Sequence, residues 1–132
     1  MTSQLIELPR RTEELATELV DAAYSVHSEL GPGLLESIYE RCLCHELSLR
    51  GIEFEQQVVL PIAYKDLMIE GGLRLDLIVD RQIIVELKAV EKIITVHRAQ
   101  ILTYLKLAGF RLGFLVNFNV PKIKQGIERL IL

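Results

Sequence analysis

Two apolar, β-rich segments in the middle of this chain each carry one carboxylate. Residues 73–80 alternate apolar and polar side chains and include Asp76. Residues 83–88 begin with apolar side chains on both faces, which predicts a central strand, and include Glu86. Burying an ionised carboxylate in a sheet is costly unless it is paired with a cation or bound to a metal. A chain with this pattern must therefore fold so that both carboxylates meet a positive partner.

The short connection between the two segments predicts which residues face each other. If residues 80–82 form a three-residue hairpin loop, Val79 pairs with Ile83. In this register Asp76 lies directly opposite Glu86, at a Cβ separation of about 4.5–5.5 Å. A two-residue loop would instead place Asp76 on the wrong side of the sheet. Because two like charges this close repel each other, the register predicts a cation between them.

Two kinds of cation fit this position. One is a divalent metal, because two carboxylates and a main-chain carbonyl, with water and phosphate oxygens, form a typical Mg²⁺ site. The other is the pair of Arg74 and Lys88, which the same register places opposite each other. Lys88 shares a strand face with Glu86 and can orient a water nucleophile or stabilise charge on a phosphate. The alternative is a salt-bridged cluster of these four residues without chemistry.

The remaining pattern predicts three helices and two further strands. Helices are expected over residues 12–30, 34–50 and 96–108, and strands over residues 52–60, 73–80, 83–88 and 110–118. Thr12 can cap the first helix, and Gly109 ends the third. Residues 126–132 fit either a short edge strand or a helical turn. The order α-α-β-β-β-α-β predicts one α/β domain over residues 1–132, with helices flanking a mixed sheet and residues 1–11 as a flexible N-terminal segment.

The strand that carries Asp76 is expected to begin only at Leu73. Residues 65–72 are a polar stretch that separates it from the preceding strand. The apolar residues at odd positions from Leu73 to Val79 are expected on one strand face, with Asp76 on the other.

Polar residues on two of the expected helices are candidates to complete a site. On the third helix, His97, Gln100 and Tyr104 share one face and predict a row that lines a cleft. On the second helix, Glu36 lies one turn before Tyr39. A lone acid at such a position more often stabilises the positive end of the helix dipole.

The composition is that of a globular protein without a membrane span. Half of the 132 residues are hydrophobic and 25% are charged, and no apolar run approaches the ~20 residues that cross a bilayer. The N-terminus lacks the apolar stretch of a signal peptide, so a cytoplasmic protein is expected. Cys42 and Cys44 are interpreted as reduced structural thiols. A zinc site that includes His45 is the alternative, although no second ligand pair follows.

Charge is unevenly distributed along the chain. Residues 1–87 hold 7 basic and 16 acidic residues, a net charge of −9, whereas residues 88–132 hold 8 and 2, a net charge of +6. The basic part can supply a surface for phosphates even in a protein of net charge −3. An ordinary solvated face is the equally compatible alternative.

The chain resembles a known family through a series of short motifs. Residues 33–39, Gly-Leu-Leu-Glu-Ser-Ile-Tyr, read as the signature of the GxxExxY family, which belongs to the PD-(D/E)XK nuclease superfamily. The resemblance continues through Asp76, residues 86–88, residues 100–105 and residues 117–118. It covers about residues 20–129. The proline of the superfamily's name is absent, because a leucine precedes Asp76.

The resemblance implies a restriction-endonuclease-like αβββαβ core with a metal-dependent phosphodiesterase site. It implies that Asp76 and Glu86 are metal ligands, together with the main-chain carbonyl of Leu87. It implies that Lys88 is the catalytic lysine, and that Glu36 is the acid of the first core helix, which acts directly or through water. The substrate-binding residues implied or expected are Gln100 and Tyr104 as a QxxxY motif, His97 and Arg74.

Three functions from different classes follow from these features. The first is a nuclease that depends on Mg²⁺, which Mn²⁺ can replace, and that hydrolyses DNA or RNA. The second is a catalytically silent nuclease-fold module that binds nucleic acid or a protein partner. The third is a purely structural homodimer, which rests only on small size and apolar content.

Overall fold

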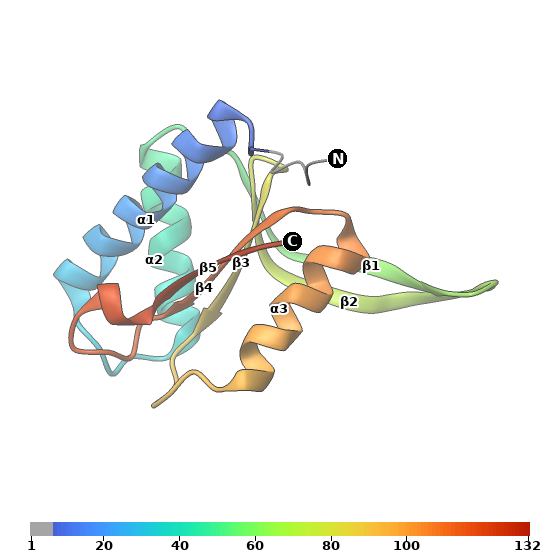
Figure 1. The fold of residues 1–132 in the computed structure, drawn as a ribbon. Coiled ribbons are helices and arrows are strands. Elements are labelled where there is room, and N and C mark those ends of the chain that lie inside the picture. Colours follow the sequence, from blue (N-terminus) through green and yellow to red (C-terminus); the bar gives the residue numbers. More distant parts are fainter. Residues whose placement is uncertain (1–6) are drawn as a thin grey trace, which may run out of the picture.

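The computed structural model describes residues 7–132, which form a mixed sheet covered by helices on both faces (Figure 1). The helices are α1 (Arg10–Leu30), α2 (Glu36–Leu49) and α3 (Thr95–Ala108), with a short 3-10 helix η1 (Ile123–Gly126). The strands are β1 (Phe54–Tyr64), β2 (Leu67–Val79), β3 (Ile83–Lys88), β4 (Leu112–Asn117) and β5 (Ile127–Ile131). Within the described residues these five strands lie in chain order, and only β3 and β4 pair in parallel. The predicted α/β class and mixed sheet are therefore confirmed.

Two apolar layers hold the helices against the sheet. α1 and α2 pack on one face through a large buried cluster that includes Leu19, Leu43 and Phe114. α3 lies on the other face and contributes Ile101 and Leu105 to a smaller cluster. α3 also forms the crossover between the parallel strands β3 and β4, as this connection requires.

The first helix begins earlier than its sequence pattern suggests. α1 starts at Arg10, directly after Pro9, whose ring favours the start of a helix. Thr12 is therefore not a cap, and the prediction that it caps the helix is wrong. Its side chain is buried and its hydroxyl donates a hydrogen bond to the side chain of Gln82. The predicted flexible segment is wrong for residues 10–11, which are helical, and its residues 1–6 lie outside the described residues.

The sequence predicts that the polar stretch over residues 65–72 separates two strands. In the structure this stretch lies within a long hairpin instead. β1 continues to Tyr64, β2 begins at Leu67, and these two residues pair across a two-residue turn. Lys65 in this turn has a positive φ of 54°. The hairpin extends beyond the rest of the sheet as a two-stranded ribbon (Figure 1), so its side chains are solvated and polar residues fit within strands. The polar residues of this segment are therefore compatible with a solvated ribbon as well as with a loop, so the sequence pattern alone could not separate the two.

The apolar side chains at odd positions of β2 lie on one face of the sheet before Asp76 and on the other face after it. Leu77 and Val79 belong to the cluster beneath α1 and α2, whereas Leu73 and Leu75 belong to the cluster beneath α3. The prediction that these four residues share one face is therefore wrong. A regular strand alternates faces with a period of two, so the strand departs from regular geometry at Asp76.

The C-terminal tail resolves as a strand. β5 follows η1 and pairs antiparallel with β4, from Leu112 opposite Ile131 to Val116 opposite Ile127. Of the two alternatives for residues 126–132, the edge strand is therefore the one that forms.

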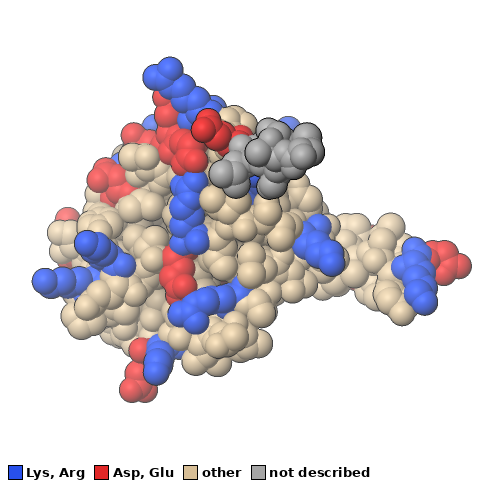
Figure 2. Space-filling model, viewed as in Figure 1, with Lys and Arg blue, Asp and Glu red and all other residues tan. Residues whose placement is uncertain are grey.

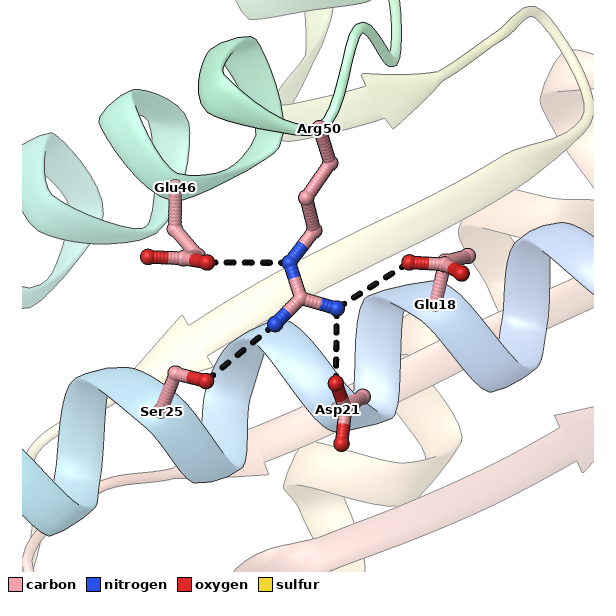
Figure 3. Close-up of polar contacts among 5 residues, drawn as sticks. All are labelled: Glu18, Asp21, Ser25, Glu46 and Arg50. Carbon is pink, nitrogen blue, oxygen red and sulfur yellow. Dashed lines mark hydrogen bonds and ion pairs between the residues drawn. The ribbon is translucent and has the colours of Figure 1, made fainter.

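Arg50, at the C-terminal end of α2, ties this helix to α1 (Figure 3). Its side chain is 19% exposed. Its Nη1 lies 3.0 Å from Glu18 Oε1 and 2.7 Å from Asp21 Oδ2. Its Nε donates to Glu46 Oε2 at 2.9 Å, and its Nη2 donates to Ser25 Oγ at 3.2 Å. One guanidinium therefore fixes the position of α2 along α1.

Replacing Arg50 by alanine should lower the free energy of unfolding by about 1–2 kcal/mol, because several partly exposed ion pairs are lost together. Urea denaturation at low salt measures the loss, which should shrink at high salt. Arg41→Ala is the matched control. Arg41 is an exposed arginine of the same helix with no ion pair among the described residues, and its loss should change stability by less than about 0.5 kcal/mol. Equal losses in both variants would contradict the role of Arg50.

Candidate active site

The two carboxylates lie where the pairing of β2 with β3 ends. Val79 pairs with Ile83, as the three-residue loop predicts, and the ladder continues only to Leu77 opposite Val85. Beyond this point Asp76 N donates to Glu86 Oε2 at 2.8 Å. The amide of the residue after Glu86 donates to Asp76 Oδ2 at 2.9 Å. Each carboxylate therefore takes the place of a backbone acceptor, and the two side chains lie together without a regular backbone pair.

These carboxylates line a cleft of about 490 Å³ that five elements form together. Its lining residues are Glu36, Ser37 and Glu40 of α2, Gln57 of β1, Arg74 and Asp76 of β2, Glu86 and Lys88 of β3, and Gln100 and Tyr104 of α3. All but one of the site side chains expected from the sequence therefore lie around one cleft. The exception is His97.

His97 caps its own helix instead of facing the cleft. Its Nδ1 accepts a hydrogen bond from Ile94 N at 3.1 Å, at the N-terminal end of α3. The first turn of a helix leaves backbone N–H groups without partners, and the imidazole satisfies one of them. His97 shares a helix face with Gln100 and Tyr104, but it does not line the cleft, so its expected role in substrate binding is not supported by the geometry.

The loop before α2 is held by the tyrosine of the GxxExxY pattern. Tyr39 Oη donates to Gly31 O at 2.6 Å and accepts from Leu34 N at 3.1 Å. Its ring stacks on Phe118, with centroids 4.6 Å apart. Tyr39 is thus a structural anchor that places Glu36, the first residue of α2, beside the cleft.

The far end of β3 is fixed in a similar way by Asn117, the last residue of β4. Its Oδ1 accepts from Val90 N at 3.1 Å and its Nδ2 donates to Val90 O at 2.9 Å. Phe118 N also donates to Lys88 O at 3.0 Å. These bonds hold the backbone on either side of Lys88.

The environment of the carboxylates raises their pKa values. Burial, and then the charge of Asp76, raise the pKa of Glu86 to about 8 from its ordinary 4.5. Glu86 is only 5% exposed. Burial also raises the pKa of Asp76, although the hydrogen bond from Leu87 N opposes this change. Burial raises the pKa values of Glu36 and Tyr104 too, with a further contribution from the neighbouring carboxylates.

The basic side chains of the cleft do not neutralise these acids by direct pairing. Among the described residues, no ion pair within 4.0 Å joins Arg74 or Lys88 to Asp76 or Glu86. Lys88 lies near enough to lower the pKa values of both carboxyls, but this is a smaller effect than burial. The salt-bridged cluster considered from the sequence therefore does not form. The lining holds four acids and two bases, an excess of two negative charges when all four acids are ionised.

A family model for the PD-(D/E)XK nuclease superfamily matches residues 13–130. The chain belongs to the PD-(D/E)XK nuclease superfamily. No curated protein and no solved structure matches the chain. The mixed sheet with its flanking helices is consistent with the restriction-endonuclease-like fold of this superfamily. PD-(D/E)XK nucleases act on nucleic acids and generally use divalent metals.

The carboxylate pair suits a divalent cation of this kind. The described part of the chain holds no group of three His, Cys, Asp or Glu side chains that could bind a metal ion. The zinc interpretation of Cys42, Cys44 and His45 is therefore not supported, and both cysteines are free thiols. A PD-(D/E)XK site built on two carboxylates fits Mg²⁺, which keeps several waters and also binds substrate phosphates.

Three residues of this PD-(D/E)XK cleft were not expected from the sequence: Ser37, Glu40 and Gln57. Glu40 is nearly buried, at 9% exposure, and follows Glu36 by one helical turn. That four-residue spacing places both acids on one helix face and could have identified Glu40. Ser37 and Gln57 carry no such signal, because neither belongs to a periodic pattern.

The charged surface shows no single basic patch on the face drawn in Figure 2. Lys and Arg side chains are interspersed with Asp and Glu side chains, and the tip of the β1–β2 ribbon carries both signs. The basic side chains on this face therefore form no continuous surface of one sign. No helix within residues 7–132 is long and apolar enough to cross a membrane.

Proposed function

We propose that this protein is a Mg²⁺-dependent nuclease of the GxxExxY type that hydrolyses phosphodiester bonds of DNA or RNA. The observation that carries the proposal is the pair of adjacent carboxylates, Asp76 and Glu86, which line one cleft with Lys88 and form no ion pair with any residue within 7–132. Two adjacent buried carboxylates destabilise the fold when both are ionised and no cation is bound, which supports a cation-binding role for this pair.

The cation would be held by Asp76, Glu86 and the main-chain carbonyl of Leu87. Glu36 would act through water, since it does not complete a group of three close ligands with them. When bound, Mg²⁺ supplies an activated water nucleophile and neutralises charge on the phosphate.

The other cleft residues would act on the substrate. The ammonium of Lys88 stabilises the negative charge that grows on the phosphate in the transition state. Gln100 and Tyr104 donate hydrogen bonds from α3 to the same phosphate or its neighbour. Arg74 of β2 also lines the cleft and attracts the backbone of the nucleic acid.

The proposal is tested by a cleavage assay on single-stranded DNA, double-stranded DNA and RNA of the same sequence. We expect cleavage of at least one substrate with Mg²⁺ or Mn²⁺ and none with a chelator. Asp76→Asn should remove cleavage and also the rise in melting temperature that Mg²⁺ gives by binding the folded state. Cleavage that persists in Asp76→Asn would point to a contaminant. A wild-type protein that binds nucleic acid but cleaves no substrate would support the silent module instead.

A further inference from the structure

The structure shows a hydrogen-bonded bridge between Glu40 of α2 and Gln57 of β1, in the cleft that Asp76 also lines. The Nε2 of Gln57 lies 3.0 Å from both Oε1 and Oε2 of Glu40, so it donates to that carboxylate. Gln57 lines the same cleft as Asp76, and its side-chain amide lies close enough to lower the pKa of that carboxyl. A glutamine amide nitrogen carries two N–H groups, so one can serve each acid.

The backbone of β1 is distorted where this bridge begins. Gln57 has a φ of 48°, in the left-handed region that residues other than glycine rarely adopt. Gln56 pairs with Leu77 and Val58 pairs with Leu75, which places Gln57 level with Asp76, although these two do not form a ladder pair.

The distortion brings two successive side chains to one acid. Gln56 Nε2 donates to Glu40 Oε2 at 3.1 Å, alongside the bond from Gln57. Consecutive residues of a regular strand point to opposite faces, so both could not reach Glu40 without the left-handed turn at Gln57. Strained backbone of this kind persists where the surrounding structure enforces it, often at functional sites.

We infer that Glu40 and Gln57 are positioning residues that fix the carboxylate of Asp76 for cation binding. Leu87 N of β3 donates to Asp76 Oδ2, and the amide of Gln57, which lies level with Asp76 on β1, is placed to hold the carboxylate from the other neighbouring strand. Glu40 orients that amide with both of its oxygens. This inference rests on the proposed function, because it assigns the bridge to the same cation.

A glycine substitution separates positioning from folding. Gln57→Gly removes the amide but suits the positive φ, so relief of strain offsets part of the lost contact and the melting temperature should stay close to that of wild type. Its affinity for Mn²⁺, measured by titration calorimetry on the full chain without nucleic acid, should fall roughly tenfold or more, as for other residues that orient metal ligands. In cleavage, kcat should fall while KM for the nucleic acid stays similar.

Two further variants complete the experiment. Gln56→Ala is the matched control, since Gln56 contacts Glu40 but lies outside the cleft, and its Mn²⁺ affinity should equal that of wild type. Glu40→Gln keeps the shape but only one acceptor oxygen, so its affinity should lie between those of wild type and Gln57→Gly.

The outcomes distinguish this inference from the proposed function. Unchanged Mn²⁺ affinity in Gln57→Gly, or an equal loss in Gln56→Ala, overturns the positioning role while cleavage by the wild type still stands. A wild type that binds Mn²⁺ but cleaves no substrate overturns the proposal that the protein is a nuclease. The Mn²⁺ titrations of the variants then still test the positioning role of Glu40 and Gln57. A wild type that binds no Mn²⁺ overturns both.

Discussion

Replacing Lys88 by alanine should abolish cleavage while leaving the protein folded and able to bind Mg²⁺ and nucleic acid. A group that stabilises mainly the transition state affects turnover more than ground-state binding. Removing one such group typically lowers kcat by about 10²–10³-fold. The stability should change little, because Lys88 forms no ion pair within 4.0 Å among the described residues. Cleavage kinetics and thermal melting, measured on the same preparation, check the expected loss of turnover and the expected small change in stability.

Lys106→Ala is the matched control for this variant. Lys106 is an exposed lysine of α3 that does not line the cleft, so its loss should leave kcat unchanged. If Lys88→Ala were instead destabilised by roughly 3–5 kcal/mol, as when a buried ion pair is broken, the lysine would be structural. That result, together with a wild type that cleaves nothing, would end the enzyme hypothesis.

Replacing Glu86 by glutamine should stabilise the cation-free protein at alkaline pH and abolish activity. The folded state raises the pKa of Glu86 from 4.5 to about 8, so between these values the folded chain holds a proton that the unfolded chain does not. The stability of the wild type therefore falls as the pH rises through this window. Glutamine is neutral throughout and can still accept the hydrogen bond from Asp76 N. Above pH 8 the variant should melt at least about 5 °C higher than wild type, and below pH 4.5 the difference should vanish.

With Mg²⁺ present, wild type should instead melt at a higher temperature than Glu86→Gln. Mg²⁺ requires the ionised carboxylate, so it stabilises wild type and not Glu86→Gln, and its affinity for wild type should rise with pH towards 8. Melting curves of wild type and Glu86→Gln from pH 4 to pH 9, each with and without Mg²⁺, measure these differences. Glu91→Gln neutralises an exposed acid outside the cleft and should melt like wild type. A Glu86→Gln protein that melts lower than wild type at pH 9 would contradict the destabilising charge.

The carboxylate site was predictable because its signal lies in the linear sequence. Asp76 and Glu86 each interrupt an apolar strand, and the loop length between their strands predicted the register that brings them together. The register was confirmed from Val79 to Leu77. The sequence could not show that the ladder stops there, because that depends on side-chain oxygens accepting the amides in place of backbone oxygens.

On α3, periodicity predicted the helix face of the polar residues but not their positions along the helix. His97 lies on the helix face of Gln100, yet it caps the first turn by accepting a hydrogen bond from the amide of Ile94. The ribbon over residues 65–72 was missed because a two-stranded arm in solvent has no buried face to show in its sequence. Gln57 was missed because its role depends on a left-handed backbone, which no single residue other than glycine signals.

Asp76 N donates to Glu86, and Leu87 N donates to Asp76. Side chains of the candidate site therefore complete the pairing of β2 with β3 at this end of the sheet. At this level the seam between β2 and β3 is closed by acceptors whose charge varies with pH and with any bound cation. Protonating a carboxylate weakens the bond it accepts, since charge-assisted hydrogen bonds are the stronger kind. We therefore expect the seam to open locally more often when the carboxylates are protonated, while the core beneath α1 and α2 stays intact. Amide hydrogen exchange at Asp76 and Leu87 reports that local opening directly.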